Sequence, residues 1–204
     1  MKIICIGQNY REHNREMQSA EPTEPVFFLK PDTSILIRNR PFYYPGFTEE
    51  LHYEAEIVVK INKVGRHIQP KFAHTYYHEV AFGLDLTARD LQRRCKANGH
   101  PWEISKGFEG SAPISRFISL QESGFEIQNI PFSLAKNGVV VQEGNTSDMI
   151  FAVNEIIAYV STYFTLKTGD MIFTGTPSGV GPLAIGDQLE GFIGQQKMLS
   201  MEIR

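Results

Sequence analysis

Ionisable side chains alternate in the stretch LHYEAEIVVK, residues 51–60, where His52, Glu54 and Glu56 stand at every second position. The apolar end of this stretch is typical of a buried β-strand, and alternate residues of a strand point to the same face. Two carboxylates on one partly buried face repel each other and are costly to desolvate, so we expect a positive charge beside them. Carboxylate oxygens bind hard divalent cations, so the pattern indicates a site for Mg²⁺, Ca²⁺ or Mn²⁺; a solvent-facing edge strand is the alternative.

A third ligand is expected elsewhere in the chain, because two carboxylates fill at most half of an octahedral shell. Asp85 is the candidate, since it ends the apolar run VAFGLD, where a charge needs a partner. The alternative is an ordinary acidic residue at the entry of the helix that we expect after Thr87.

A possible general base lies in GQNYREHNREM, residues 7–17. On a helix, His13 and Glu16 are three residues apart and share a face. A carboxylate beside an imidazole fixes the tautomer of the ring and raises its basicity, as a general base requires. The alternative is a surface salt bridge on a charged helix.

Two further segments contain residues that could contact an anion. In GTPSGVG, residues 175–181, glycines would let backbone N–H groups and Thr176 approach a small anion, and the alternative is a tight connection. Lys106, in ISKGFEG, could place a cation in a pocket, and the alternative is an exposed lysine. No Ser-His-Asp or Cys-His arrangement has supporting local sequence.

The composition describes an ordinary globular protein of 204 residues, 42% hydrophobic and 21% charged, with a net charge of −3. Lysine and arginine are scattered, so we expect no nucleic-acid partner. Cys5 and Cys95 have no metal-binding spacing and are expected to be reduced thiols. The apolar run at the N-terminus is too short to be the core of a signal peptide, and no apolar run is long enough to span a membrane. We therefore expect a cytoplasmic protein with no membrane partner.

Strand patterns dominate the chain, which predicts one β-rich α+β domain over residues 1–204 with two or three helices. Asn137-Gly138, between two apolar runs, predicts a two-residue hairpin. Strands are expected at 2–7, 26–30, 34–38, 51–60 and 80–86, with more after residue 117. Helices are expected at 10–18, from an N-cap at Thr87 to a stop at Gly99, and from Thr146 to Phe164.

Seven segments taken in order resemble the fumarylacetoacetate hydrolase family: IGQNYREH, FLKP, HYEAEIVV, GLDLTARDLQ, SKGFEGSAP, NGVVVQEGNTSDMIF and GDMIFTGTPSGVG. The resemblance runs from Gly7 to about Asp187 and is closest to the single-domain branch of acylpyruvases and oxaloacetate decarboxylases. Because the chain starts at the strand KIICIG, we expect it to lack the N-terminal domain of fumarylacetoacetase. The resemblance implies a rolled, mixed β-sheet with flanking helices, usually in a homodimer.

The resemblance also implies roles for individual residues. Residues 8–24, which carry His13 and Glu16, correspond to a lid that orders over the substrate. Gln8 stands where this branch often has arginine, so the resemblance leaves the substrate preference open. Glu54, Glu56 and Asp85 would hold Mg²⁺ or Mn²⁺, with Ca²⁺ a possible occupant in crystals. Arg89, Gln92, Lys106 and Thr176 match positions that meet the substrate.

These features together predict a metal-dependent hydrolase that cleaves a C–C bond of an acylpyruvate, such as fumarylpyruvate or acetylpyruvate, to pyruvate and a carboxylic acid. The carboxylate and 2-keto oxygen of this 2-oxo acid would chelate the metal, which stabilises an enolate. His13 with Glu16 would activate water, and Lys106 would help to carry the enolate charge. Oxaloacetate decarboxylation and 2-oxo acid tautomerisation at the same site are alternatives. The non-enzyme alternative is a silent metal- or acid-binding scaffold.

Overall fold

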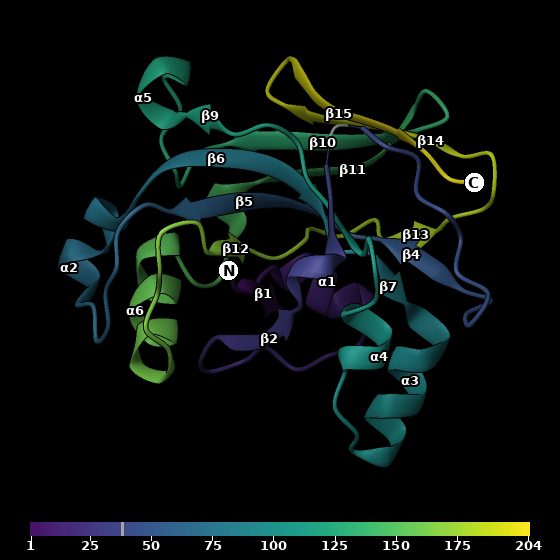
Figure 1. Ribbon diagram of the computed structural model, residues 1–204, viewed down its shortest axis with the longest axis horizontal. Helices are drawn as coiled ribbons and strands as arrows, with labels where there is room; N and C mark the ends of the chain where they lie inside the picture. The colour runs from purple at the N-terminus through teal and green to yellow at the C-terminus, as the bar shows by residue number, and fades with distance from the viewer. Residues whose placement is uncertain (38) are drawn as a thin grey trace.

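A six-stranded mixed β-sheet carries the candidate site (Figure 1). The computed structural model describes residues 1–37 and 39–204. The strand order is β2 (Val26–Lys30), β1 (Ile3–Gly7), β12 (Met171–Phe173), β5 (Ala55–Ile61), β6 (Tyr77–Leu84) and β9 (Ile118–Ser119). β1 and β12 are parallel and the other neighbours are antiparallel, so the sheet is mixed, as the resemblance implied.

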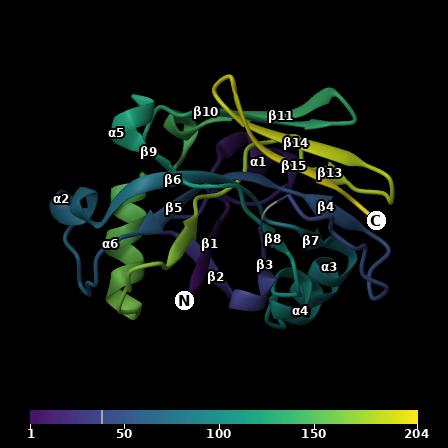
Figure 2. The same cartoon turned by 45° about the horizontal axis from the view of Figure 1, so that its top comes forward.

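A second, antiparallel sheet packs across the first (Figure 2). The main hydrophobic core contains side chains from both sheets. The strand order of the second sheet is β11 (Val139–Asn145), β10 (Pro131–Lys136), β14 (Gln188–Ile193) and β15 (Gln196–Glu202). Gly191 of β14 lies against Phe82 of β6, where a Cβ would come within 2.2 Å of a ring carbon. Only glycine therefore lets these two strands approach so closely.

Short strands and helices complete the β-rich α+β fold predicted from the sequence. Two small sheets contain β13 (Gly181–Pro182), β4 (Leu51–Tyr53) and β7 (Thr87–Ala88), and β3 (Ile35–Leu36) and β8 (Ala112–Pro113). The α-helices are α1 (Arg11–Glu16), α2 (Pro70–Ala73), α3 (Arg89–Asn98), α4 (Glu103–Lys106), α5 (Leu120–Ser123) and α6 (Val153–Tyr163). The 3-10 helices are η1 (Asp32–Ser34), η2 (His74–Tyr76) and η3 (Thr146–Asp148). None of the helices in the described part of the chain is long and apolar enough to cross a membrane.

The predicted hairpin at Asn137-Gly138 is confirmed. These two residues join β10 to β11 with φ values of 54° and 80°. Positive φ at both positions is the requirement of a type I′ turn, which explains the Asn-Gly pair. The strand predicted at 51–60 is also present, but it is interrupted at Glu54, between β4 and β5.

The prediction that a helix begins near Thr146 was wrong. Residues 146–148 form the turn η3, and α6 begins at Val153. The intervening backbone is held by Asn9, whose side chain accepts a hydrogen bond from the N–H of Phe151 and donates one to its carbonyl. A tertiary contact with a residue more than 140 positions away therefore overrides the local helical pattern.

Thr87 is not the N-cap of α3. It lies in β7, opposite His52, and Ala88 is the residue that precedes the helix. Pairing with β4 takes the place of a local cap, whereas the predicted stop at Gly99, with φ of 63°, is confirmed. The strand predicted at 34–38 is reduced to β3, and its last residue, Arg38, lies outside the described residues.

Candidate active site

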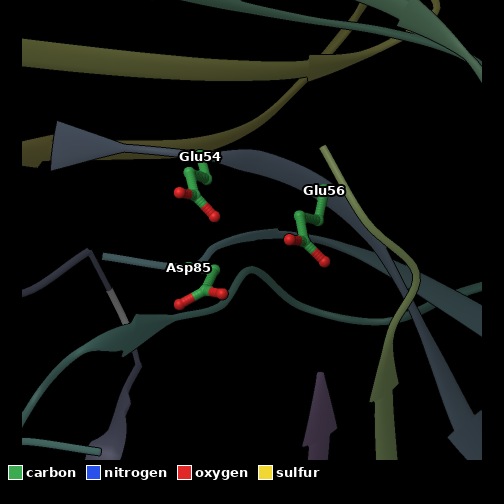
Figure 3. Close-up of side chains that lie close together, drawn as sticks. All are labelled: Glu54, Glu56 and Asp85. Atoms are coloured by element: carbon green, nitrogen blue, oxygen red, sulfur yellow. The ribbon is translucent and has the colours of Figure 1, made fainter. Parts of the chain in front are cut away.

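Glu54, Glu56 and Asp85 converge on one point although they come from different strand ends (Figure 3). Glu54 lies between β4 and β5, Glu56 lies on β5, and Asp85 follows the last residue of β6. The backbone N–H of Asp85 donates to the carbonyl of Glu54 at 2.8 Å, which brings the two chain segments together. Each residue offers a carboxylate oxygen within 4.8 Å of the others, and all three side chains are buried.

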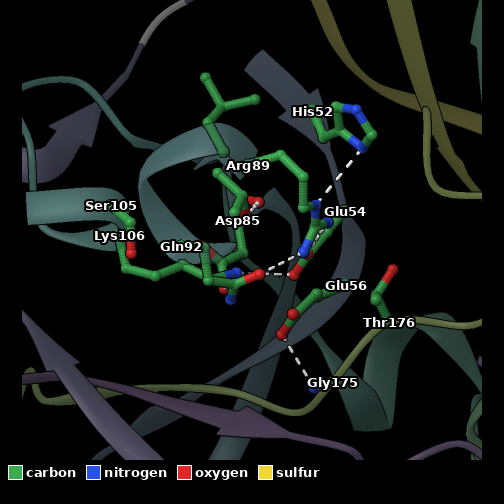
Figure 4. Close-up of polar contacts among 12 residues, drawn as sticks. His52, Glu54, Glu56, Asp85, Arg89, Gln92, Ser105, Lys106, Gly175 and Thr176 are labelled. Atoms are coloured by element: carbon green, nitrogen blue, oxygen red, sulfur yellow. Dashed lines mark hydrogen bonds and ion pairs between the residues drawn. The ribbon is translucent and has the colours of Figure 1, made fainter. Parts of the chain in front are cut away.

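Three buried side-chain cations surround this triad. Lys106 Nζ donates to Glu54 Oε2 and to Asp85 Oδ2, each at 2.8 Å. Arg89 contacts Glu54 Oε1 at 2.5 Å (Figure 4), and Lys30 Nζ lies 2.7 Å from Asp85 Oδ1. The expectation that a metal alone compensates the carboxylates was therefore incomplete, because the protein supplies cations of its own.

The two glutamates of the triad have opposite electrostatic environments. Burial disfavours the ionised form of Glu54, but the charges of Lys106 and Arg89 outweigh it and hold the pKa of Glu54 well below its usual value. Burial and the charge of Asp85 raise the pKa of Glu56 well above its usual value. The main polar contact of Glu56 is the backbone N–H of Gly175, which donates to Oε2 at 2.8 Å. The surroundings of Glu54 therefore stabilise its ionised form, whereas the surroundings of Glu56 disfavour ionisation.

The donor set fits a hard divalent cation. Asp85 Oδ1 is buried and contacts Lys30 as an ion pair, but it accepts no hydrogen bond from the described residues. Each carboxylate oxygen has two lone pairs, so oxygens that already contact a cation keep a second position for a metal. Three carboxylates at this spacing suit Mg²⁺ or Mn²⁺, which prefer oxygen ligands.

The structure brings His13 and Glu16 together on α1. His13 Nδ1 lies 3.2 Å from Glu16 Oε2, and the Glu16 carboxylate also accepts the N–H of Gly179 at 3.1 and 3.2 Å. Burial lowers the pKa of His13, although the charges of Glu54 and Glu16 oppose this effect. Burial therefore favours the neutral imidazole, and the ring is connected to the glycine-rich loop through one carboxylate.

The loop at 175–181 is organised around the triad. Gly175 has φ of 103°, and a Cβ there would come within 2.8 Å of Asn9, so this position requires glycine. Thr176 lines the cavity above the triad, and its Oγ1 accepts a hydrogen bond from Gln142 Nε2 at 3.0 Å. The loop therefore contacts Glu56 through its backbone and the cavity through a hydroxyl.

The cavity beside the triad is narrow, and His13 and Asn14 of α1 are among the residues that line it. The space free for small molecules is about 40 Å³, which is room for a few waters. His13 lines the cavity together with Arg89 and Gln92, which are joined by a 2.6 Å hydrogen bond. Entry of an organic acid therefore requires α1 or its side chains to move.

Sequence reasoning gave no role to Lys30, although it occurs in the quoted segment FLKP. Its signal was a charge at the end of the apolar strand VFFLK, comparable to Asp85 at the end of its own strand. Lys96 and Trp102, which line the same cavity, were also given no role. Their positions on α3 and before α4 become informative only when the two helices are seen side by side (Figure 1).

Two packed sheets with a buried carboxylate triad define a class of β-rich proteins built around a candidate divalent-cation site. The sequence profile described as "Fumarylacetoacetate (FAA) hydrolase C-terminal" matches residues 2–203, and the chain belongs to this family. The resemblance read from the seven segments is thereby confirmed.

Similar proteins in the family carry names of several reactions. The chain is 44% identical over 202 residues to the mitochondrial oxaloacetate tautomerase FAHD1 of Bos taurus, covering 99% of this chain and 90% of that protein. It is 43% identical over 188 residues to the oxaloacetate tautomerase YcgM of Escherichia coli, covering 92% and 86%. A crystal structure of fumarylpyruvate hydrolase from Pseudomonas aeruginosa with Mn²⁺ and pyruvate superposes with a TM-score of 0.94 at 36% identity, covering 100% and 89%. The names of these three relatives are those of enzymes that act on 2-oxo acids.

Proposed function

We propose that this protein is a divalent-cation-dependent tautomerase of short 2-oxo acids of the oxaloacetate type. The observation that carries the proposal is a buried imidazole of lowered pKa, His13, in the wall of a cavity whose floor is a carboxylate triad. The names of the relatives that are 44% and 43% identical support a proton transfer in oxaloacetate.

The triad would hold the cation, Mg²⁺ or Mn²⁺, and the cation would supply Lewis-acid chemistry to the carboxylate and the 2-oxo group of the substrate. Lys106 is held by Glu54 and Asp85 at the floor, where its ammonium can carry charge that develops on the C2 oxygen. Arg89, Gln92 and Thr176 line the same cavity and would orient the substrate carboxylate.

His13 would move the proton. Its Nδ1 faces Glu16, which assigns the N–H to Nδ1 and leaves Nε2 with a free lone pair. Nε2 would take a proton from C3 of the keto form, and the C3–H electron pair would become the C2–C3 double bond. The π pair of the C2 carbonyl would move onto its oxygen, and the proton would then be delivered to that oxygen. No atom is gained or lost, so the reaction needs no co-reactant.

Acylpyruvate hydrolysis, the main prediction from the sequence, is the second candidate. The TM-score of 0.94 to the fumarylpyruvate hydrolase favours it, because the same base and the same floor could activate water against a distal carbonyl. Oxaloacetate decarboxylation at this floor is the third reaction of the group. The homodimer and the cytoplasmic location remain predictions.

A substrate panel tests the proposal. The purified protein is assayed with Mg²⁺ and with Mn²⁺ for the enol–keto conversion of oxaloacetate, and for pyruvate release from oxaloacetate, fumarylpyruvate and acetylpyruvate. We expect enol–keto conversion to be the fastest reaction and to disappear on chelation of the metal. Faster pyruvate release from an acylpyruvate would overturn the tautomerase assignment in favour of the hydrolase.

A further inference from the structure

Helix α3 presents a polar stripe to the cavity. Arg89, Gln92 and Lys96, spaced by three and four residues, all line it and therefore share one helical face. With a rise of 1.5 Å per residue, the stripe extends roughly 10 Å from the triad outward. Arg89 at the inner end is held by Glu54, so the outer end of the stripe is the part that remains available to a ligand.

Two lysines occupy similar positions on the aromatic wall of this cavity but differ in their partners. Lys106 Nζ lies 5.2 Å from the centroid of the Phe28 ring, and Lys96 Nζ lies 5.2 Å from the centroid of a ring of Trp102. The two aromatic side chains are themselves in contact, with centroids 5.7 Å apart. Lys106 is neutralised by two carboxylates, whereas Lys96 forms no ion pair with any residue in the described part of the chain.

The surroundings of Lys96 favour an anion. Partial burial lowers the pKa of Lys96, and the charges of Arg89 and Lys106 lower it further, while Glu54 opposes them. Two cations and one carboxylate act on this ammonium, so a ligand carboxylate beside it would favour its charged form. The residue as a whole is exposed, so Lys96 lies at the open side of the cavity.

We propose that Lys96, supported by Trp102, binds the distal carboxylate of the substrate and makes the site selective for dicarboxylic over monocarboxylic 2-oxo acids. The inference rests on the proposed function for the position of the first carboxylate, which lies at the triad. The second carboxylate of a four-carbon diacid lies only a few bonds from the first, so the Lys96 side chain, which leans toward the N-terminus of α3, would bring its ammonium back to meet it. The Trp102 ring limits where the ammonium can lie and gives the chain of the substrate an apolar surface.

The test compares Lys96→Met and Lys96→Arg in the full-length, metal-loaded protein with oxaloacetate and with acetylpyruvate, which lacks the distal carboxylate. Lys96→Met should raise the KM for oxaloacetate roughly 10- to 100-fold, the loss expected for one hydrogen bond to a charged group, and change the KM for acetylpyruvate much less. Lys96→Arg should recover most of the loss. Lys63→Met is the matched control, because Lys63 makes the same contact with Tyr76, at 4.9 Å, but does not line the cavity.

A binding measurement separates the failure of this inference from the failure of the proposed function. Calorimetry with oxalate and with 2-hydroxysuccinate should show that Lys96→Met weakens only the longer diacid. If both ligands, or both substrates, lose affinity equally, Lys96 does not bind the distal carboxylate and the inference is wrong. If Lys96→Met weakens the binding of 2-hydroxysuccinate but not of oxalate, and no 2-oxo acid is turned over, the inference holds and the proposed function fails.

Discussion

The charged side chains at the inner floor of the cavity and at its outer wall differ in the partners that they contact. At the floor, defined as the triad with Lys30, Lys106 and Arg89, both oxygens of Glu54 and of Asp85 contact a cation. At the outer wall, Lys96 has an aromatic partner but no carboxylate among the described residues, and α1 is held to the glycine-rich loop through Glu16.

This difference indicates which charged residues of the site can be substituted without a large loss of folding stability. A buried charge that loses its partner is strongly destabilising, so the floor is bound to the stability of the fold as well as to chemistry. A partly solvated charge such as Lys96 can be replaced at little cost to folding. The floor therefore suits the groups that all 2-oxo acids share, and the outer wall suits the groups that distinguish them.

The largest effect is expected for His13→Ala, which removes the proposed base without touching the floor. Enol–keto conversion, and any acylpyruvate hydrolysis, should fall roughly 10²–10⁴-fold, because a positioned base contributes about that factor. Oxaloacetate decarboxylation should change much less, since loss of CO₂ needs no base. Steady-state kinetics on the three reactions measure this. Equal losses in all of them would assign His13 to binding or closure instead.

The second prediction compares two substitutions at the floor, Glu54→Gln and Glu56→Gln, in the metal-free protein. Glu54→Gln leaves the buried Arg89 without its carboxylate and Lys106 with Asp85 alone, and it should lower the free energy of unfolding by about 3 kcal/mol. Glu56→Gln removes a charge that burial and Asp85 disfavour, so stability should be unchanged or higher. Urea denaturation with chelator present measures both. A similar loss for both variants would show that the two glutamates are equivalent.

The pH dependence of stability sharpens the same comparison. The pKa of Glu56 is raised in the folded state, so the unfolded chain ionises first as the pH rises above the ordinary value of about 4.5. The stability contributed by the protonated form is present below that pH and is lost as the pH rises toward the folded-state pKa. Glu56→Gln should therefore flatten this decline, and denaturation midpoints measured from pH 4.5 upward test it. An unchanged slope would contradict the raised pKa.

A smaller effect is expected in the pH dependence of activity. Burial lowers the pKa of His13, so the acidic limb of kcat/KM should lie below 6.5, the ordinary value for histidine. Glu16 opposes this lowering, and Glu16→Gln should move the limb to a still lower pH. Rate profiles between pH 4.5 and 8 measure the position of the limb. A limb that moves upward in the variant would exclude Glu16 as the partner that raises the basicity of His13.

The smallest change is expected in the lid segment proposed at residues 8–24. The start of the segment is fixed, because Asn9 donates to the carbonyl of Thr174 and exchanges hydrogen bonds with Phe151. Helix α1 is joined to the glycine-rich loop through the Glu16 carboxylate, which accepts the N–H of Gly179. Saturating oxalate with Mg²⁺ should slow hydrogen exchange in this segment, because a ligand at the floor would hold α1 closed. Exchange at the floor strands β5 and β6 serves as the internal control. Identical exchange with and without ligand would contradict a lid.

Local patterns in the sequence predicted the elements whose conformation depends on neighbours in the chain. The hairpin followed from Asn137-Gly138, the end of α3 from Gly99, and the shared face of Glu54 and Glu56 from their alternation. The start of α6 was misplaced because the preceding segment is bound to Asn9, a contact that no local pattern contains. Turn and strand geometry depend on residues close in the sequence, whereas the start of α6 depends on a contact between residues far apart in the sequence.

The candidate site divides in the same way. The sequence by itself determined which side chains carry charge on the core face of a strand, and it predicted the triad, His13 with Glu16, and Lys106. Only the tertiary structure decided that Lys30 and Arg89 meet those carboxylates and that Lys96 meets none in the part of the chain that the structure describes. The reason is that a buried charge requires a partner, but the requirement does not specify which one. That choice depends on which strand and helix ends the folded sheet brings together.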